Sequence, residues 1–433
     1  MADLAPADAD MFWSSRRRAS DQFLLYCFAA HSDTSIDRLI RELRGHADRI
    51  PDLHLRVAPV WRDLAYPRWC TAAVGDGQFR HHRGPRTWDE CRAAVADLLT
   101  EGLDPTVHSW RVHLFGPVTG APRASGPATV AVVQISHALA DGRGASDLAR
   151  ALLGGTVPET AAVPGDPPGA VAAMVGAAEV PLRLVAAFGL GLVAWRRAGP
   201  EPAESGPEPL PATVLNRRPG PLRRVDLVVT DAELLRLGDA SITVSVLAVL
   251  AQVLTDFLPD ADPALAVELT LARSDGFDHS DVARNRFHTA GVRLYPDLAP
   301  DARAQAIAAE ITDARRRDET PARRADRRAA AVTPPVLRAF AARVAANAPA
   351  PDRVTGVTVV SSVNRGPADF RLAGGDVLFT AGFPALSAVH AMTIGVHGLG
   401  GTVTISVTTD PAAVDADRFV RVLRSALGRS VVT

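Results

Sequence analysis

One histidine stands where a hydrophobic run ends. His137 follows the apolar stretch 128–135, and Asp141 and Gly142 come shortly after it. A neutral imidazole can accept a proton at neutral pH, because its unperturbed pKa is about 6.5. Asp141 can hold the turn through side-chain hydrogen bonds or an ion pair, and Gly142 can adopt backbone angles that other residues avoid. A single histidine before a turn is more often structural than catalytic, so the flanking sequence must decide.

The flanking sequence favours a catalytic position for this histidine. Val130, Val132, Val133 and Ile135 predict a buried strand, and a helix is expected over 145–153. The segment 142–144 between them has two glycines and can let a substrate approach its backbone. We therefore predict that His137 ends a buried strand and faces a substrate.

The chain mixes strand-like and helix-like segments without strict βαβ order, which predicts an α+β fold. Its 433 residues are too many for one ordinary domain. We expect an N-terminal lobe at 1–155, a proline-rich crossover linker at 156–212 and a C-terminal lobe at 213–433. The main predicted strands are 23–30, 53–60, 110–115, 128–135, 224–229, 265–271, 357–363, 388–396 and 401–408, the last two forming a hairpin; the main predicted helices are 35–46, 88–99, 243–257, 301–317 and 415–427.

The linker contains a short apolar helix, predicted over 180–195. Its most apolar run, 184–195, is shorter than the roughly 20 residues that cross a bilayer, so we expect no membrane span. Packing against the body of the protein is the favoured interpretation. Contact with a membrane surface is the alternative, because Arg183, Arg196 and Arg197 flank the apolar side chains.

Composition excludes several classes of protein. The formal net charge is −1, so no global field attracts nucleic acid or an anionic membrane. All basic residues are arginine, as codon bias in a GC-rich genome produces. Cys27, Cys70 and Cys91 are few and lack metal-ligand spacing, which predicts no disulfide framework, no metal site and a reducing compartment. Residues 1–10 do not resemble a signal peptide. We expect a cytoplasmic protein, either soluble or peripheral to a membrane or a lipid droplet, that does not bind nucleic acid.

The pattern of His137, Asp141 and Gly142 after a hydrophobic strand resembles the His-x-x-x-Asp-Gly signature of the chloramphenicol-acetyltransferase-like superfamily. Further segments resemble the wax ester synthase/acyl-CoA:diacylglycerol acyltransferase family and follow its order over about 10–430. These segments are 103–114, 215–224, 285–296 and 361–374.

This resemblance implies two chloramphenicol-acetyltransferase-like lobes, each a mixed sheet with helices, with an active-site tunnel between them. It also implies an O-acyltransferase that moves a fatty acyl group from acyl-CoA to diacylglycerol or a long-chain alcohol. His137 would be the general base, and neither a metal nor a cofactor would be needed. Two alternatives stay open: acyl transfer from a carrier-protein thioester in polyketide or glycolipid assembly, and a catalytically degenerate lipid-binding relative.

The positions of other residues in the chain suggest their roles at the site. Asp141 is expected to fix the ring of His137, with Gly142 shaping the loop and Arg273 as the partner of Asp141. Ser361 and Ser362 are candidate donors to an oxyanion, the alternative being ordinary strand serines. The predicted substrate-contacting residues are Ser136, Asn285, Ser361 and Ser362.

The chain departs from the family pattern at several positions. Ser136 replaces the first of two adjacent histidines, Val244 and Ser245 replace an Asn-Asp pair, and Ser362 replaces an asparagine. One extra residue precedes Gly366. These departures leave the acyl chain, the acceptor and the degree of activity open.

Overall fold

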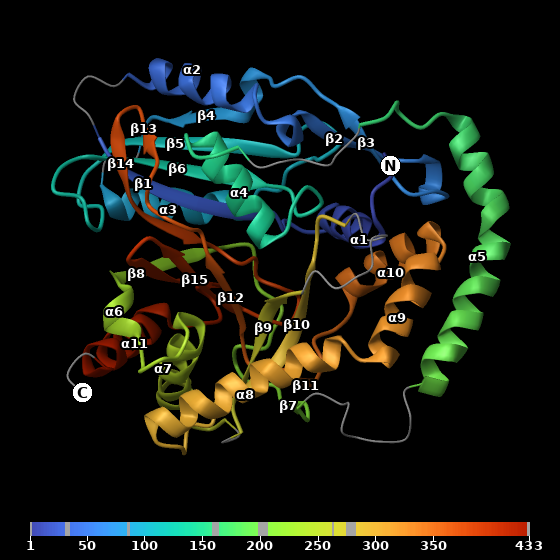
Figure 1. The fold of residues 1–433 in the computed structure, drawn as a ribbon. Helices are drawn as coiled ribbons and strands as arrows, with labels where there is room; N and C mark the ends of the chain where they lie inside the picture. The colour runs from blue at the N-terminus through green and yellow to red at the C-terminus, as the bar shows by residue number, and fades with distance from the viewer. Residues whose placement is uncertain are drawn as a thin grey trace.

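The computed structural model describes residues 2–30, 35–84, 87–157, 164–197, 207–261, 264–273 and 283–430. Within these ranges the chain forms two six-stranded sheets, each covered by helices (Figure 1). Two short two-stranded sheets accompany them. This arrangement agrees with the predicted α+β fold of two mixed-sheet lobes.

The first sheet has the strand order β13-β14-β1-β6-β5-β4. Its central strands are apolar on both faces because α2 and α4 pack on one side, while α3 and strand β8 of the other sheet pack on the opposite side. Its strands are β1 (Gln22–Ala29), β4 (Phe79–His82), β5 (Trp110–Val118), β6 (Ala128–Ile135), β13 (Arg371–Leu372) and β14 (Gly375–Gly382).

Two strands of the first sheet come from late in the chain. β14 pairs antiparallel with β1, with Tyr26 opposite Thr380, and β13 pairs with β14. Residues 371–382 therefore belong to the sheet that carries His137, although they lie far beyond the predicted lobe boundaries at 155 and 212. β14 also contacts β15 and β16 of the second sheet and so links the two lobes.

The second sheet has the order β10-β9-β12-β15-β16-β8. β15 and β16 form the predicted antiparallel hairpin, and the sheet packs against α7, α8 and α11 around a large apolar core. Its strands are β8 (Arg224–Asp231), β9 (Ala266–Ala272), β10 (Phe287–Arg293), β12 (Val359–Asn364), β15 (Met392–Leu399) and β16 (Thr402–Thr409).

The helices and minor elements complete the fold, and sequence patterns missed several of them. α1, α9 and α10 are additions to the predicted set. The helices are α1 (Pro6–Ser15), α2 (Ile36–Ala47), α3 (Trp88–Leu98), α4 (Gly142–Leu152), α5 (Ala170–Arg197), α6 (Ala232–Leu235), α7 (Ile242–Phe257), α8 (Pro300–Asp318), α9 (Pro321–Val332), α10 (Pro335–Asn347) and α11 (Ala416–Ser430). The minor elements are η1 (Pro51–His54), η2 (Trp61–Asp63), η3 (Asp76–Gln78), β2 (Leu55–Ala58), β3 (Arg68–Thr71), β7 (Leu210–Pro211) and β11 (Arg353–Val354).

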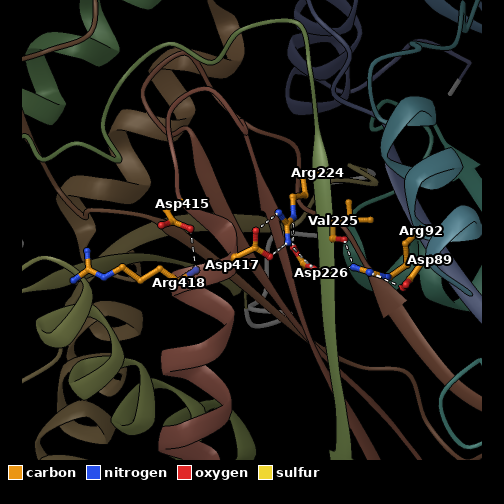
Figure 2. Close-up of polar contacts among 8 residues, drawn as sticks. All are labelled: Asp89, Arg92, Arg224, Val225, Asp226, Asp415, Asp417 and Arg418. Atoms are coloured by element: carbon orange, nitrogen blue, oxygen red, sulfur yellow. Dashed lines mark hydrogen bonds and ion pairs between the residues drawn. The ribbon is translucent and has the colours of Figure 1, made fainter.

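An ion-pair network joins α3 of the first lobe to β8 of the second (Figure 2). Arg92 donates to Asp226 at 2.7 Å and to the carbonyl of Val225 at 3.0 Å. Arg224 contacts Asp226 on the same strand and Asp417 on α11, and it holds the pKa of the exposed Asp417 carboxyl below its usual value. The network fixes one edge of the interface between the lobes.

The linker helix is the main correction to the predicted fold. α5 begins at Ala170, ten residues before the predicted start, and continues through Pro181. It packs against α9 and η2 and runs along one side of the molecule (Figure 1, green). Its span Ala170–Arg196 has 27 residues and is long and apolar enough to cross a membrane. The prediction that the apolar segment is too short is therefore wrong.

Candidate active site

His137 lies in the turn between β6 and α4. The strand that leads to it is buried from Val130 to Ile135. The turn is closed by the Leu139 amide, which donates to the carbonyl of Ser136 at 2.9 Å. The ring is partly exposed and borders a cavity of about 650 Å³ between the two lobes. This position fits a side chain held rigidly but reachable by a ligand.

Asn285 fixes which nitrogen of His137 carries the proton. The Asn285 side-chain amide donates to the His137 carbonyl at 2.6 Å and to the Asp8 carboxylate at 2.9 Å. Its oxygen then faces His137 Nδ1 at 3.3 Å. The opposite amide orientation would place an oxygen against two acceptors, so we assign the amide this way. Nδ1 is therefore the donor, and Nε2 keeps its lone pair.

Burial makes His137 a neutral base. Desolvation lowers the pKa of His137 below 6.5, while the hydrogen bond with Asn285 and the charge of Asp141 oppose this shift. The neutral form is therefore the dominant one at pH 7. In the described part of the chain no protein group hydrogen-bonds Nε2 of His137. The ring is prepared to accept a proton from a ligand.

Asp8 on α1 anchors Asn285, a residue that sequence analysis did not connect with it. The Asp8 carboxylate is 1% exposed and accepts from the backbone amides of Arg284 at 3.0 Å and Asn285 at 2.9 Å, besides the Asn285 side chain. Desolvation raises the pKa of Asp8. The residue stands in an acidic N-terminal segment with no sequence signal that separates it from its neighbours. A chain of contacts thus runs from Asp8 through Asn285 to His137.

Asp141 caps α4 and ties it to the second lobe. Its Oδ1 accepts from the amides of Arg143 at 3.1 Å and Gly144 at 3.0 Å, and its Oδ2 accepts from the amide of Arg286 at 3.1 Å. The predicted partner Arg273 instead donates to Asp318 at 3.1 Å. The prediction that Arg273 pairs with Asp141 is therefore wrong, and the backbone amides of Arg143, Gly144 and Arg286 hold this carboxylate.

Gly142 does not have the unusual backbone angles that the sequence analysis allowed for. It is the first residue of α4 and is not among the described glycines with positive φ. A Cβ there would lie 3.4 Å from the side chain of Val363 on β12. This distance is an ordinary van der Waals contact, so a side chain at position 142 would touch the second lobe beside His137 without a clash.

The predicted serines have different surroundings. Ser136 is fully buried, and its hydroxyl accepts from the Ala138 amide at 3.3 Å. Ser362 lines the cavity, and its hydroxyl contacts that of Thr243 on α7 at 2.7 Å. Among the described residues Ser136, Asn285 and Ser361 are not part of the cavity lining. Ser362 is thus the predicted serine that the structure brings to the cavity.

The cavity lies between α4 and the strands β9, β10 and β12. The lining from α4 is polar, whereas the lining from the strands mixes apolar side chains with Thr270, Ser362 and Asn364. The polar lining residues on α4 are Arg143, Ser146, Asp147 and Arg150, and the apolar residues opposite are Leu271, Ala272, Phe287 and Val363. Such a passage suits an elongated ligand with both apolar and polar parts.

Among the described residues no group of three or more His, Cys, Asp or Glu side chains could hold a metal ion. The thiols of Cys27 and Cys91 are buried, and burial raises the pKa of Cys91 to about 12. Burial also raises the pKa of the Cys27 thiol. These thiols are therefore poor nucleophiles.

Comparison with solved structures identifies the fold. No family model matches the chain, and no curated protein matches it in sequence. A wax ester synthase/diacylglycerol acyltransferase from Marinobacter aquaeolei matches over 100% of this chain and 99% of its own, with a TM-score of 0.66 at 16% identity. The two-lobed fold of this chain is therefore similar to the fold of that enzyme.

Two further structures support this assignment of the fold. A trichothecene 15-O-acetyltransferase from Fusarium sporotrichioides matches with a TM-score of 0.61 at 12% identity, over 100% of this chain and 94% of its own. A starter condensation domain of rhizomide synthetase, solved with C8-CoA, matches with a TM-score of 0.58 at 13% identity, over 99% and 94%. The predicted chloramphenicol-acetyltransferase-like architecture is confirmed.

Proposed function

We propose that this protein is an O-acyltransferase that moves a fatty acyl group from acyl-CoA to a hydroxyl acceptor, diacylglycerol or a long-chain alcohol. The observation that carries the proposal is the fixed tautomer of His137: Asn285 holds Nδ1–H, and Nε2 is a neutral base beside the cavity. The fold of the structural relatives, among them a wax ester synthase and an acetyltransferase, supports the reaction class.

The reaction can be written with His137 as the only group that exchanges protons. Nε2 accepts the hydroxyl proton while the acceptor oxygen attacks the thioester carbon. The tetrahedral intermediate then expels the CoA thiolate, and the imidazolium returns the proton to that sulfur. The products are an ester and free CoA. General base catalysis of this kind contributes roughly 10²–10⁴-fold in rate.

The remaining site residues have supporting roles in this proposal. Asp141 keeps the turn and α4 in place, and its charge favours the imidazolium that forms during the reaction. Ser362 is the candidate donor to the oxyanion, because its hydroxyl lies at the cavity within reach of Thr243, which can orient it. The mechanism needs no covalent acyl-enzyme, so no cysteine takes part. It also needs no metal or cofactor besides the acyl-CoA substrate.

We further propose that the protein acts in the cytoplasm, at the surface of a membrane. Three cysteines without disulfides suit a reducing compartment, and the proposed acceptors are membrane lipids. The exposed helix α5 is the candidate for the contact.

The decisive experiment incubates the purified chain with labelled palmitoyl-CoA and either hexadecanol or diacylglycerol, and measures labelled neutral lipid. His137→Ala should lower kcat by about 10²–10⁴-fold. His81→Ala, which changes a histidine outside the site, is the matched control and should leave kcat unchanged. Undiminished product from His137→Ala would exclude the general-base role.

The same assay separates the two alternatives. Transfer from a palmitoylated carrier protein, with none from palmitoyl-CoA, would favour the carrier-dependent reaction. Tight binding of fatty acid without any product would favour the lipid-binding protein.

A further inference from the structure

Helix α5 has an unusual surface for a helix packed on a folded protein. The most apolar 18-residue window of Ala170–Arg196 has a mean hydropathy of 1.7, yet only 11% of that window is buried. Its charged residues in this span are Glu179 and Arg183, which pair with each other at 2.9 Å, and Arg196 near its end. At 1.5 Å per residue the span is about 40 Å long. A large apolar surface is therefore left outside the core.

Helix α5 buries its small residues and exposes its large apolar ones, which is the reverse of an ordinary amphipathic helix. The residues it buries are small: Ala173 and Ala194 are 6% and 2% exposed, and Gly176 packs against the backbone of Leu64. The large side chains point outward. Those more than 70% exposed are Val171, Met174, Leu182, Val185, Phe188 and Trp195. Exposed apolar patches of this extent mark a binding surface.

The ends of α5 show that it lies along a surface and does not cross a bilayer. Before the helix, the Gly165 amide donates to the Trp69 carbonyl at 2.9 Å; after it, Leu210 pairs with Val354. Both ends are thus tied to the same body, and the helix packs on α9 along its course. The described residues contain no second long apolar helix by which the chain could return across a membrane.

The charge beside α5 indicates what the surface binds. α9 carries four arginines and one aspartate, and Arg323 and Arg324 are exposed. Glu179, the acidic side chain of α5 itself, is already paired with Arg183. An exposed apolar helix with arginines next to it complements an anionic lipid surface, where acyl chains lie beneath phosphate groups.

We infer that α5 lies in the plane of an anionic phospholipid bilayer. The outward side chains of α5 enter the boundary between headgroups and acyl chains, and Arg323 and Arg324 of α9 contact the phosphates. This inference rests on no catalytic step. It specifies the membrane contact proposed above, and it is tested without substrate, so its failure leaves the acyltransferase proposal untouched.

The test is flotation of the full chain with vesicles of phosphatidylcholine mixed with phosphatidylglycerol. Wild type should float with these vesicles. Leu182→Asp/Phe188→Asp should bind at least about tenfold more weakly, because two apolar contacts are replaced by two charges that anionic lipid repels. The matched control is Val107→Asp/Leu222→Asp, which changes two exposed apolar side chains outside α5, α9 and α10. Equal thermal unfolding of all variants verifies that the fold is intact.

A second pair of variants tests the charge. Arg323→Glu/Arg324→Glu should bind the mixed vesicles about tenfold or more weakly, whereas the exposed pair Arg38→Glu/Arg41→Glu on α2 should bind like wild type. Wild type that stays unbound, or an α5 variant that floats like wild type, would overturn the inference. A third result would also overturn the inference: wild type sediments as a dimer, Leu182→Asp/Phe188→Asp sediments as a monomer, and both float equally well. In that case α5 would bind a second copy of the chain and not a membrane.

Discussion

Two histidines at the interface between the lobes, the partly exposed His137 and the buried His397, show opposite hydrogen bonding. Nδ1 of His137 donates to the Asn285 side chain, whereas Nδ1 of His397 accepts from the Gly382 amide at 3.1 Å. In the neutral ring, His397 must therefore carry its proton on Nε2. Burial lowers the pKa of both histidines. A lowered pKa alone does not distinguish a base from a structural histidine.

Access and neighbouring charge make the difference between them. His137 borders the cavity, while His397 is 4% exposed and is not part of its described lining. The guanidinium of Arg365, which donates to Thr380 at 2.5 Å and to the Ala381 carbonyl at 2.9 Å, lowers the pKa of His397 further. His397 is thus locked between strands β14 and β15, and His137 is the histidine that can meet a substrate.

Of the predictions that compare the two histidines, the largest loss of kcat is expected from replacing Asn285, which sets the tautomer of His137. Asn285→Ala removes the acceptor for Nδ1–H, so the proton is no longer held away from Nε2, and kcat should fall about 100-fold. The control Asn347→Ala changes an exposed asparagine on α10 and should have no effect. Unchanged kcat in Asn285→Ala would mean that the contact with His137 is structural only.

Replacing His397 should change stability and not catalysis. His397→Ala leaves the buried Gly382 amide without its acceptor, which should lower the free energy of unfolding by about 1–3 kcal/mol. Urea unfolding measures this loss, and the kcat of the folded protein should stay at the wild-type value. A loss of kcat without a loss of stability would reverse the roles assigned to the two rings.

The smallest effect concerns pH. Since desolvation lowers the pKa of His137, kcat/KM should fall with decreasing pH only below 6.5, where the ring becomes protonated and can no longer accept a proton. Asp141→Asn should move this acidic limb to still lower pH, because the Asp141 charge raises the pKa of His137. His397→Ala should leave the pH at which kcat/KM begins to fall unchanged. A limb above pH 6.5 in wild type would contradict the assignment of His137 as the titrating base.

Local sequence patterns predict the parts of the site that are close in the chain. The apolar strand that ends at Ile135 and the helix that follows Asp141 are both adjacent to His137 in the sequence. Hydrophobic periodicity and the capping residue predict the type and the order of these two elements. The contact of Asp8 with Asn285 joins residues 277 positions apart. No local sequence pattern predicts a contact between residues so far apart. The pairing of β14 with β1 is equally invisible to local patterns.

Two errors have identifiable physical causes. Arg273 follows a strand near the site, which suggests it as the partner of Asp141, but the strand order places it beside Asp318 on α8. The predicted helix contains Pro181, Gly189 and Gly191, but it begins at 180 and so leaves out Gly176, a residue of low helix propensity. The helix nevertheless includes Gly176, which is needed where the helix meets the Leu64 backbone.

The placement of β14 also affects how the chain is assembled during synthesis. Until residues 375–382 leave the ribosome, β1 has no neighbour on one side and offers bare amide and carbonyl groups there. A nascent or truncated chain ending near 155 would carry an open, apolar edge suited to pairing with other chains. The first lobe is complete only when the chain has been made through residue 382.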